Sequence, residues 1–161
     1  MRWDDFAQQC PELAKLGEDR LRQRELCLVG TLRHNGYPRI SPVEPEFVDG
    51  DLILGMMWHS PKALDLLRDP RCVVHSVVSD RSGTEGDFKL YGRAVDIQDP
   101  VRRARYRATV KARIDWEPSE PRYHCFVIDI ESAGFRVFGD DEYGLAWAPT
   151  SGLRRWTPSG G

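Results

Sequence analysis

The sequence predicts a mainly β protein, an antiparallel barrel with a few short helices, from two observations. Segments of strand length, apolar or alternating, follow one another along the chain, and turn sequences such as Asn35-Gly36 and Asp49-Gly50 join them as hairpins. The helical segments are few, and the one between the third and fourth strands is too short to cover a parallel sheet. The 161 residues suffice for a sizeable core, so we expect one domain over residues 1–161.

Composition indicates a folded protein without strong affinity for polyanions. Hydrophobic residues make up 40% of the chain and charged residues 30%, and the net charge of -2 gives no general attraction to nucleic acid or anionic membranes. No apolar run approaches the roughly 20 residues that span a bilayer, and the first residues lack a signal peptide's apolar core, so we expect a cytoplasmic protein. The cysteines form no C-x-x-C pair and the histidines show no ligand spacing, which favours buried thiols and predicts no metal site.

The first hairpin has two unequal strands. Residues 26–32 are apolar on both faces of a strand, which is typical of a central position in a sheet. The return strand, from residue 38 to about residue 48, contains Pro42 and Pro45, and proline cannot donate a hydrogen bond to a neighbouring strand. This segment is therefore predicted to be an edge strand or a bulged one, with backbone groups free for a ligand.

The other elements follow from the same patterns. We expect a helical segment over 1–24 that is broken at Pro11 and Gly17, strands at 52–57, 72–78, 88–97 and 125–130, a continuation at 134–138 after a kink, short strands at 143–147 and 153–156, helices at 61–69 and 101–113, a loop at 80–86 and a frayed tail at 157–161. Gly92, inside a long strand, predicts a bulge or a close backbone approach.

The helix over 101–113 is rich in arginine. Its apolar stripe is assigned to Val101, Ala104, Ala108 and Ala112, which predicts a surface helix. Arginines on such a helix can bind nucleic acid or another polyanion, but the acidic residues that follow dilute the charge. A solvated face is favoured, and we expect neither a nucleic-acid nor a membrane partner.

Ser60-Pro61-Lys62 begins the short helix in an unusual way. Ser60 is a good N-cap and Pro61 a good first helical residue, but Lys62 places a cation at the positive end of the helix dipole. This arrangement is favourable when an anion sits there, because free backbone N–H groups, a hydroxyl and an ammonium then converge on it. The alternative is an exposed lysine on an ordinary capped helix.

Several short sequences occur in an order that is typical of one family. They are Leu28-Val29-Gly30-Thr31-Leu32 with Asn35-Gly36, Pro38-Arg39-Ile40-Ser41-Pro42-Val43, the Asp49-Gly50 turn, Ser60-Pro61-Lys62-Ala63 with Leu66-Leu67-Arg68-Asp69-Pro70-Arg71, and Gly92-Arg93-Ala94. Over roughly residues 20 to 140 the chain thus resembles the pyridoxamine 5'-phosphate oxidase-like superfamily, the flavin-binding split barrels.

The resemblance implies a six-stranded antiparallel split β-barrel of Greek-key type that pairs into a homodimer, with FMN, or F420 in some branches, at the dimer interface. It implies that Arg39, Ser41 and Val43 run along the flavin and that Ser60 and Lys62 meet the phosphate. Trp58 would flank the ring, with plain packing as the alternative. The candidate cofactor-binding residues are Arg39, Ser41, Val43, Met57, Trp58, Ser60 and Lys62. No catalytic side chain is identified, since the cofactor carries the redox chemistry in such proteins.

Three departures from the family pattern bear on function. Glu44 stands where phosphate-binding relatives often carry a lysine, Asp87 aligns with a glutamine that often touches the flavin, and the C-terminal arginine-rich substrate motif is absent. Oxidation of pyridoxamine phosphate is therefore not expected. The sequence predicts a flavin-dependent oxidoreductase for a small planar substrate. An F420-dependent reductase and a non-catalytic flavin- or haem-binding module remain as alternatives, and the substrate is not identified.

Overall fold

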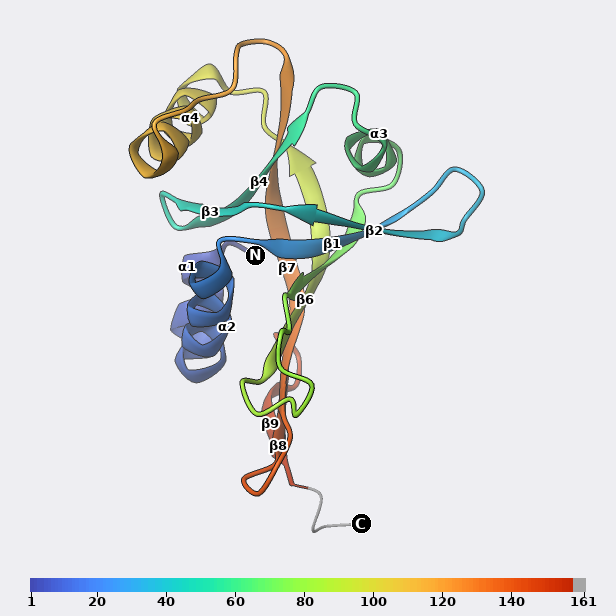
Figure 1. Ribbon diagram of the computed structural model, residues 1–161, viewed down its shortest axis with the longest axis vertical. Coiled ribbons are helices and arrows are strands. Elements are labelled where there is room, and N and C mark those ends of the chain that lie inside the picture. The colour runs from blue at the N-terminus through green and yellow to red at the C-terminus, as the bar shows by residue number, and fades with distance from the viewer. Residues whose placement is uncertain (158–161) are drawn as a thin grey trace.

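One antiparallel sheet carries the fold, with four helices around it, in the computed structural model, which describes residues 1–157 (Figure 1). The helices are α1 (Trp3–Gln9), α2 (Pro11–Arg24), α3 (Pro61–Arg68) and α4 (Pro100–Ile114). The strands are β1 (Cys27–Leu32), β2 (Pro38–Val43), β3 (Pro45–Val48), β4 (Asp51–Met57), β5 (Arg71–Ser76), β6 (Asp87–Asp96), β7 (Tyr123–Val137), β8 (Tyr143–Ala148) and β9 (Gly152–Trp156). The predicted mainly β, antiparallel class is confirmed, and the predicted tail lies outside the described residues beyond Thr157.

The prediction of six strands is wrong, because the described residues form nine. The return strand of the first hairpin is two strands, β2 paired with β1 and β3 paired with β4, and these are the two ends of the order β2-β1-β5-β6-β7-β4-β3. The break falls at Glu44, directly before Pro45, which has no N–H to donate. The consecutive segment 38–48 thus joins both ends of the sheet, and β8 and β9 extend it beside β7.

The N-terminal helices cover one side of the sheet (Figure 1). Pro11 separates α1 from α2 as predicted, but Gly17 lies inside an unbroken α2, so the predicted break there is wrong. A Cβ at Gly17 would lie 2.5 Å from the ring of Phe88, which is fully buried. The absence of a side chain at Gly17 therefore lets α2 pack closely against the sheet, and the helix continues through this glycine.

The two longest strands, β6 and β7, carry the predicted irregularity. Their register shifts after the pair Tyr91 and Ser132, so that Gly92 faces Ile130 and Glu131 is left as the extra residue of a bulge. A Cβ at Gly92 would lie 2.2 Å from the backbone oxygen of Asp129, which explains the glycine. The kink expected between 130 and 134 is this bulge within a continuous β7.

Helix α4 packs through a different face from the predicted one. Its buried residues are Tyr106 and Val110, whereas Val101, Ala104, Ala108 and Ala112 are exposed. The larger side chains of Tyr106 and Val110 bury more apolar surface than the alanines would, and arginine stems can cover the apolar surface beside them. The helix's arginines pair with acids of the same chain, including Arg102 with Asp51 at 2.8 Å.

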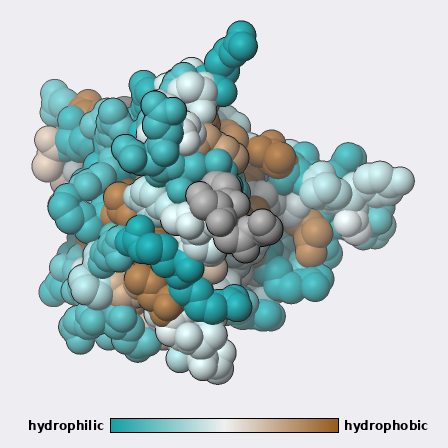
Figure 2. All heavy atoms as spheres, turned by 90° about the horizontal axis from the view of Figure 1, so that it is seen from below, coloured by the Kyte–Doolittle hydropathy of each residue, from teal (hydrophilic) through white to brown (hydrophobic). Residues whose placement is uncertain are grey.

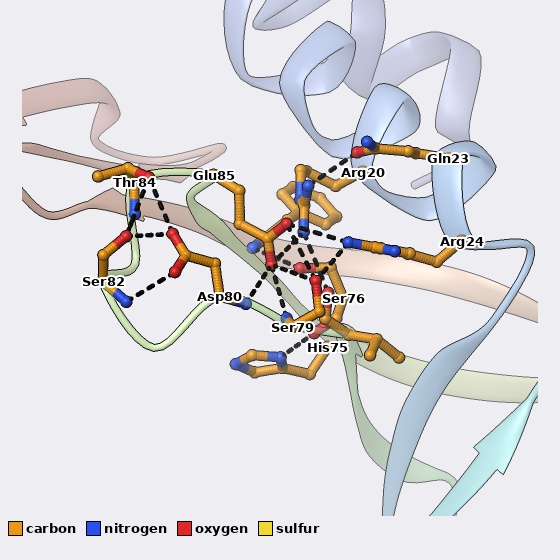
Figure 3. A network of polar contacts seen from close by, with 12 residues as sticks. Arg20, Gln23, Arg24, His75, Ser76, Ser79, Asp80, Ser82, Thr84 and Glu85 are labelled. Carbon is orange, nitrogen blue, oxygen red and sulfur yellow. Dashed lines mark hydrogen bonds and ion pairs between the residues drawn. The ribbon is translucent and has the colours of Figure 1, made fainter.

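A polar network ties the loop before β6 to α2 (Figure 3). The carboxylate of Glu85 accepts hydrogen bonds from the backbone N–H groups of Ser79 and Asp80 and pairs with the buried Arg20 at 3.1 Å. The Ser79 bond is the largest influence that lowers the pKa of Glu85, to about 2. The network fixes the loop that leads into β6.

Three further properties complete the fold. All four cysteines are buried free thiols, as predicted. Among residues 1–157 no helix is both long and apolar enough to cross a membrane. Seen from below, the molecule shows mostly polar residues, with separate apolar patches between them (Figure 2).

Candidate cofactor site at the start of helix α3

A tight turn connects β4 to α3 and carries the predicted phosphate residues. The N–H of Ser60 donates to the carbonyl of Met57 at 3.0 Å, and His59 between them has a φ of +55°. Ser60 occupies the predicted N-cap position, but its side chain makes no capping bond. The Ser60 hydroxyl oxygen is buried and has no hydrogen-bond partner in the part of the chain that the structure describes. It is therefore a polar group whose hydrogen-bonding capacity is unused.

Lys62 lies in the first turn of α3 and is half-buried. The first turn contains no acidic residue, and the Lys62 ammonium forms no ion pair with any residue in 1–157. The first backbone N–H groups of a helix have no partner within it. A cation, a hydroxyl and these N–H groups therefore surround one helix end whose dipole is positive, an arrangement suited to an anion.

A cleft of about 590 Å³ opens beside this helix end. Four of the seven candidate residues line it, namely Val43, Met57, Trp58 and Lys62. Much of the remaining wall is apolar and aromatic and comes from α4, from the loop that follows it and from the first residue of β7, including Tyr106, Val110, Trp116, Pro118 and Tyr123. Its volume and its apolar lining are those of a pocket for a cofactor-sized molecule.

Arg39, Ser41 and Ser60 do not line this cleft. Arg39, Ser41 and Val43 share one face of β2, as alternate residues do. The Arg39 Nε donates to the buried carboxylate of Asp65 on α3 at 2.7 Å, and the hydroxyl of Thr31 donates to the same carboxylate at 2.9 Å. Arg39 thus fixes α3 against the sheet, and its role along a flavin stays a prediction.

Arg39 and Thr31 stabilise the ionised form of the Asp65 carboxylate. Burial raises the pKa of Asp65, but hydrogen bonds from Arg39 and Thr31 outweigh that effect, so the pKa lies below its usual value. Arg68, one turn further along α3, also pairs with Asp65, at 3.3 Å. This network links β1, β2 and α3, and thereby positions the helix end at the cleft.

Glu44 also lines the cleft, where the sequence suggested repulsion of a phosphate. The guanidinium of Arg113 on α4 lies 2.6 Å from the Glu44 carboxylate and 2.6 Å from that of Glu46. Both acids therefore share a cation within one chain. Glu44 therefore enters the cleft as an ion-paired carboxylate instead of an isolated one, and the two acids with one guanidinium keep a net negative charge.

An aromatic cluster supports the turn from behind, and it includes a residue that the sequence did not single out. Trp58 stacks on His124 of β7 at 4.6 Å between ring centroids and on His59 at 4.5 Å. The N–H of His59 donates to His124 Nε2 at 3.1 Å. No sequence pattern could find His124, because only the pairing of Met56 with His124 between β4 and β7 brings it here.

Asp87 does not belong to this cleft within one chain. It begins β6, lies opposite Arg136 of β7 in the strand register, and forms an ion pair with Lys89 at 2.8 Å. Its alignment with a flavin-contacting glutamine therefore has no counterpart in the contacts of the single chain.

The fold and the cleft define an antiparallel β protein with a cofactor-sized pocket beside a helix start that carries Lys62. The profile of the family described as pyridoxamine 5'-phosphate oxidase matches residues 14–136, and the chain belongs to this family. No curated protein sequence matches the chain significantly.

Solved structures share the fold at low sequence identity. A pyridoxamine 5'-phosphate oxidase-related, FMN binding protein from Nostoc punctiforme has a TM-score of 0.68 and 14% identity, over 92% of this chain and 95% of that one. A putative pyridoxamine 5'-phosphate oxidase from Listeria innocua has a TM-score of 0.60 and 15% identity, over 72% and 91%. A heme binding protein from Mycobacterium smegmatis has a TM-score of 0.57 and 16% identity, over 88% of this chain and 57% of that one.

Proposed function

We propose that the protein is a homodimeric split-barrel flavoprotein that binds FMN and works as an oxidoreductase on a small planar substrate. The observation that carries the proposal is the start of α3, where Lys62, which has no ion-pair partner within residues 1–157, lines the aromatic-lined cleft of about 590 Å³ and the unsatisfied Ser60 hydroxyl lies at the same helix start. A phosphate at the helix end and a flat apolar ring in the cleft match the two halves of FMN.

The residues present fit this cofactor. Lys62 and the first N–H groups of α3 would hold the phosphate, and rotation of the Ser60 side chain would bring its hydroxyl to the same group. Trp58, 47% exposed, offers an aromatic face, and Met57, 76% exposed, offers an apolar contact. Bound FMN would supply the transfer of a hydride or of single electrons, and the chain would supply placement and exclusion of water.

Exposed apolar residues near the cleft support the proposal of a homodimer. Met57 and Trp58 stand beside Trp116, which is 60% exposed, and all three line the cleft. Large apolar side chains that gather on a surface mark contact sites. A second copy would cover them and complete the cofactor's surroundings.

The test is the visible spectrum of the purified protein, followed by titration with FMN, riboflavin and F420. We expect FMN to bind as one equivalent per chain, more tightly than riboflavin, to a protein that runs as a dimer in size-exclusion chromatography. Reduction of the bound FMN by NADH or NADPH, and reoxidation by a panel of quinones and nitro compounds, tests the oxidoreductase. Failure of both FMN and F420 to bind would overturn the proposal.

Haem binding is the second candidate, and two observations favour it. One neighbour in fold is a heme binding protein, and His59 and His124 flank Trp58, which lines the cleft. Neutral imidazole is a common ligand of haem iron. Titration with haemin distinguishes the two candidates, because a Soret band that is lost when either histidine is replaced would favour haem over FMN.

A further inference from the structure

His124 is tied to the turn before α3 through two contacts of different kinds. Its imidazole Nε2 accepts the hydrogen bond from the backbone N–H of His59 at 3.1 Å. Its ring stacks on the Trp58 indole with 4.6 Å between centroids and 9° between planes. His124 is itself 6% exposed and sits within β7, so it offers the turn a fixed support.

The turn needs such a support. His59 has a φ of +55°, in the left-handed region that costs a residue with a side chain roughly 1 kcal/mol or more. Trp58 is 47% exposed, so burial alone does not hold it. The bond from Ser60 N–H to the Met57 carbonyl closes the turn, but it does not attach the turn to the sheet. Beyond Met57, which still pairs with Tyr123 as part of β4, His124 attaches Trp58 and His59 to the sheet through its two contacts.

We propose that His124 is a positioning residue for the cofactor site, which holds the turn over 57–60 in the shape that presents Trp58, Ser60 and Lys62 to the ligand only while its Nε2 carries no proton. The inference rests on the proposed flavin function and adds a regulation by pH to it. An imidazole nitrogen can accept the His59 N–H bond only when it is unprotonated. Protonation of His124 therefore removes the acceptor and places two donors against each other.

The surroundings of His124 set the pH at which this happens. Burial is the largest influence and lowers its pKa, Asp96 of β6 opposes this, and His59 and Arg103 lower the pKa further. His124 lines a second cavity of about 630 Å³ behind Trp58, and the charged residues Glu120 and Arg107 line the same cavity. Glu120 is paired with Arg103 at 2.9 Å and Arg107 with Glu117 at 2.8 Å, so these charges are compensated.

The sign of the pH effect follows from this lowered pKa. The folded, anchored state favours neutral His124, so its contribution is fully present above the pKa of a free histidine, about 6.5. As the pH falls through the lower pKa of the folded state, the anchor is lost. Cofactor affinity should therefore fall in mildly acidic solution and stay constant above neutrality.

Two replacements separate the hydrogen bond from the stacking. His124→Phe keeps a flat ring but has no acceptor, and His124→Gln keeps an oxygen acceptor near the position of Nε2 but does not titrate. At about pH 7.5 we expect H124F to bind FMN about tenfold more weakly than the unaltered chain, the scale of one unsatisfied buried donor. We expect H124Q to bind within about threefold of the unaltered chain.

The pH profile separates positioning from general structural damage. The FMN phosphate itself titrates near about pH 6, but it does so equally in all variants. As the pH is lowered from about 7.5 to below the ordinary histidine value of about 6.5, the unaltered chain should lose several-fold more FMN affinity than H124Q. His34→Gln is the matched control, because it makes the same replacement at an exposed histidine that lines neither cavity, and it should follow the unaltered chain.

A readout without cofactor keeps the two proposals distinguishable. The amide resonance of His59 in an ¹⁵N spectrum should shift as His124 titrates, and should move to a non-hydrogen-bonded position in H124F but not in H124Q. Absence of FMN binding to the unaltered chain would refute the proposed function. The role of His124 would be overturned if the His59 amide shift changed neither with pH nor in H124F. It would also be overturned if H124Q lost FMN affinity in acid to the same extent as the unaltered chain.

Discussion

Replacement of Lys62 by Ala tests the helix end from two sides, because affinity and stability should respond in different directions. Lys62 has no ion-pair partner within residues 1–157 and no acid in the first turn of α3. Its removal therefore breaks no ion pair and no side-chain hydrogen bond among these residues. Since a cation near a helix N-terminus costs typically about 0.3–1 kcal/mol, K62A should leave the free energy of unfolding unchanged or raise it by a few tenths of a kcal/mol.

The effect on ligand binding should be much larger. A charge-assisted hydrogen bond to phosphate is worth about 1–3 kcal/mol, which is a loss of roughly 5- to 150-fold in FMN affinity. Lys62 is half-buried, so the middle of this range, about 2 kcal/mol or roughly 30-fold, is the expected value. Riboflavin, which lacks the phosphate, should bind K62A and the unaltered chain within about twofold of each other.

Flavin fluorescence titration measures the affinities, and urea unfolding of the apoprotein measures the stability. Arg81→Ala is the matched control. Arg81 is exposed in the loop before β6 and does not line the cleft, so its replacement removes the same charge away from the site. Equal losses for FMN and riboflavin would mean that Lys62 shapes the cleft instead of binding phosphate. A loss of more than about 1 kcal/mol in stability would refute the conclusion that Lys62 is unpaired.

Three further predictions concern the supports of the site. Asp65→Asn should cost about 2–3 kcal/mol of stability in urea unfolding, since it removes a buried charge that two partly exposed arginines share. Because the pKa of Asp65 is lowered in the fold, the unaltered chain loses stability as the pH falls below about 3.8, and this loss should be smaller in the variant. No change in either quantity would contradict the network. Gly17→Ala should destabilise by about 1–2 kcal/mol despite its better helix propensity of about 1 kcal/mol, because the new Cβ overlaps the Phe88 ring, and a rise in melting temperature would refute this. Glu44→Gln should change FMN affinity by less than about threefold because a guanidinium on α4 already pairs with the carboxylate, whereas a tenfold gain would show that the charge does repel the ligand.

The succession of strands along the chain could be predicted because local signals report local structure. The Asn35-Gly36 and Asp49-Gly50 turns place two hairpins, and Pro42 and Pro45 predict an edge or bulged return strand. The count of strands was wrong because the sequence does not show that β2 and β3 pair with different neighbours. Gly17 was read as a helix break, but its role is set by Phe88, a residue far along the chain.

The candidate site was predictable where its residues are neighbours in sequence. Trp58, Ser60 and Lys62 share one turn, so helix physics could indicate an anion there before any fold was known. Glu44 could not be assigned, because its cation Arg113 comes from α4 and arrives only through packing. His124 was missed for the same reason, since strand register alone places it beside Trp58.

The central claim is that the start of α3 is the phosphate end of a flavin site. A crystal structure of the protein soaked with or grown in FMN tests it most directly. The account predicts phosphate density at the first turn of α3, within hydrogen-bond distance of Lys62 Nζ, and isoalloxazine density in the cleft lined by Val43, Met57 and Trp58. Flavin density with its phosphate anywhere else, including the cavity behind Trp58, would contradict it.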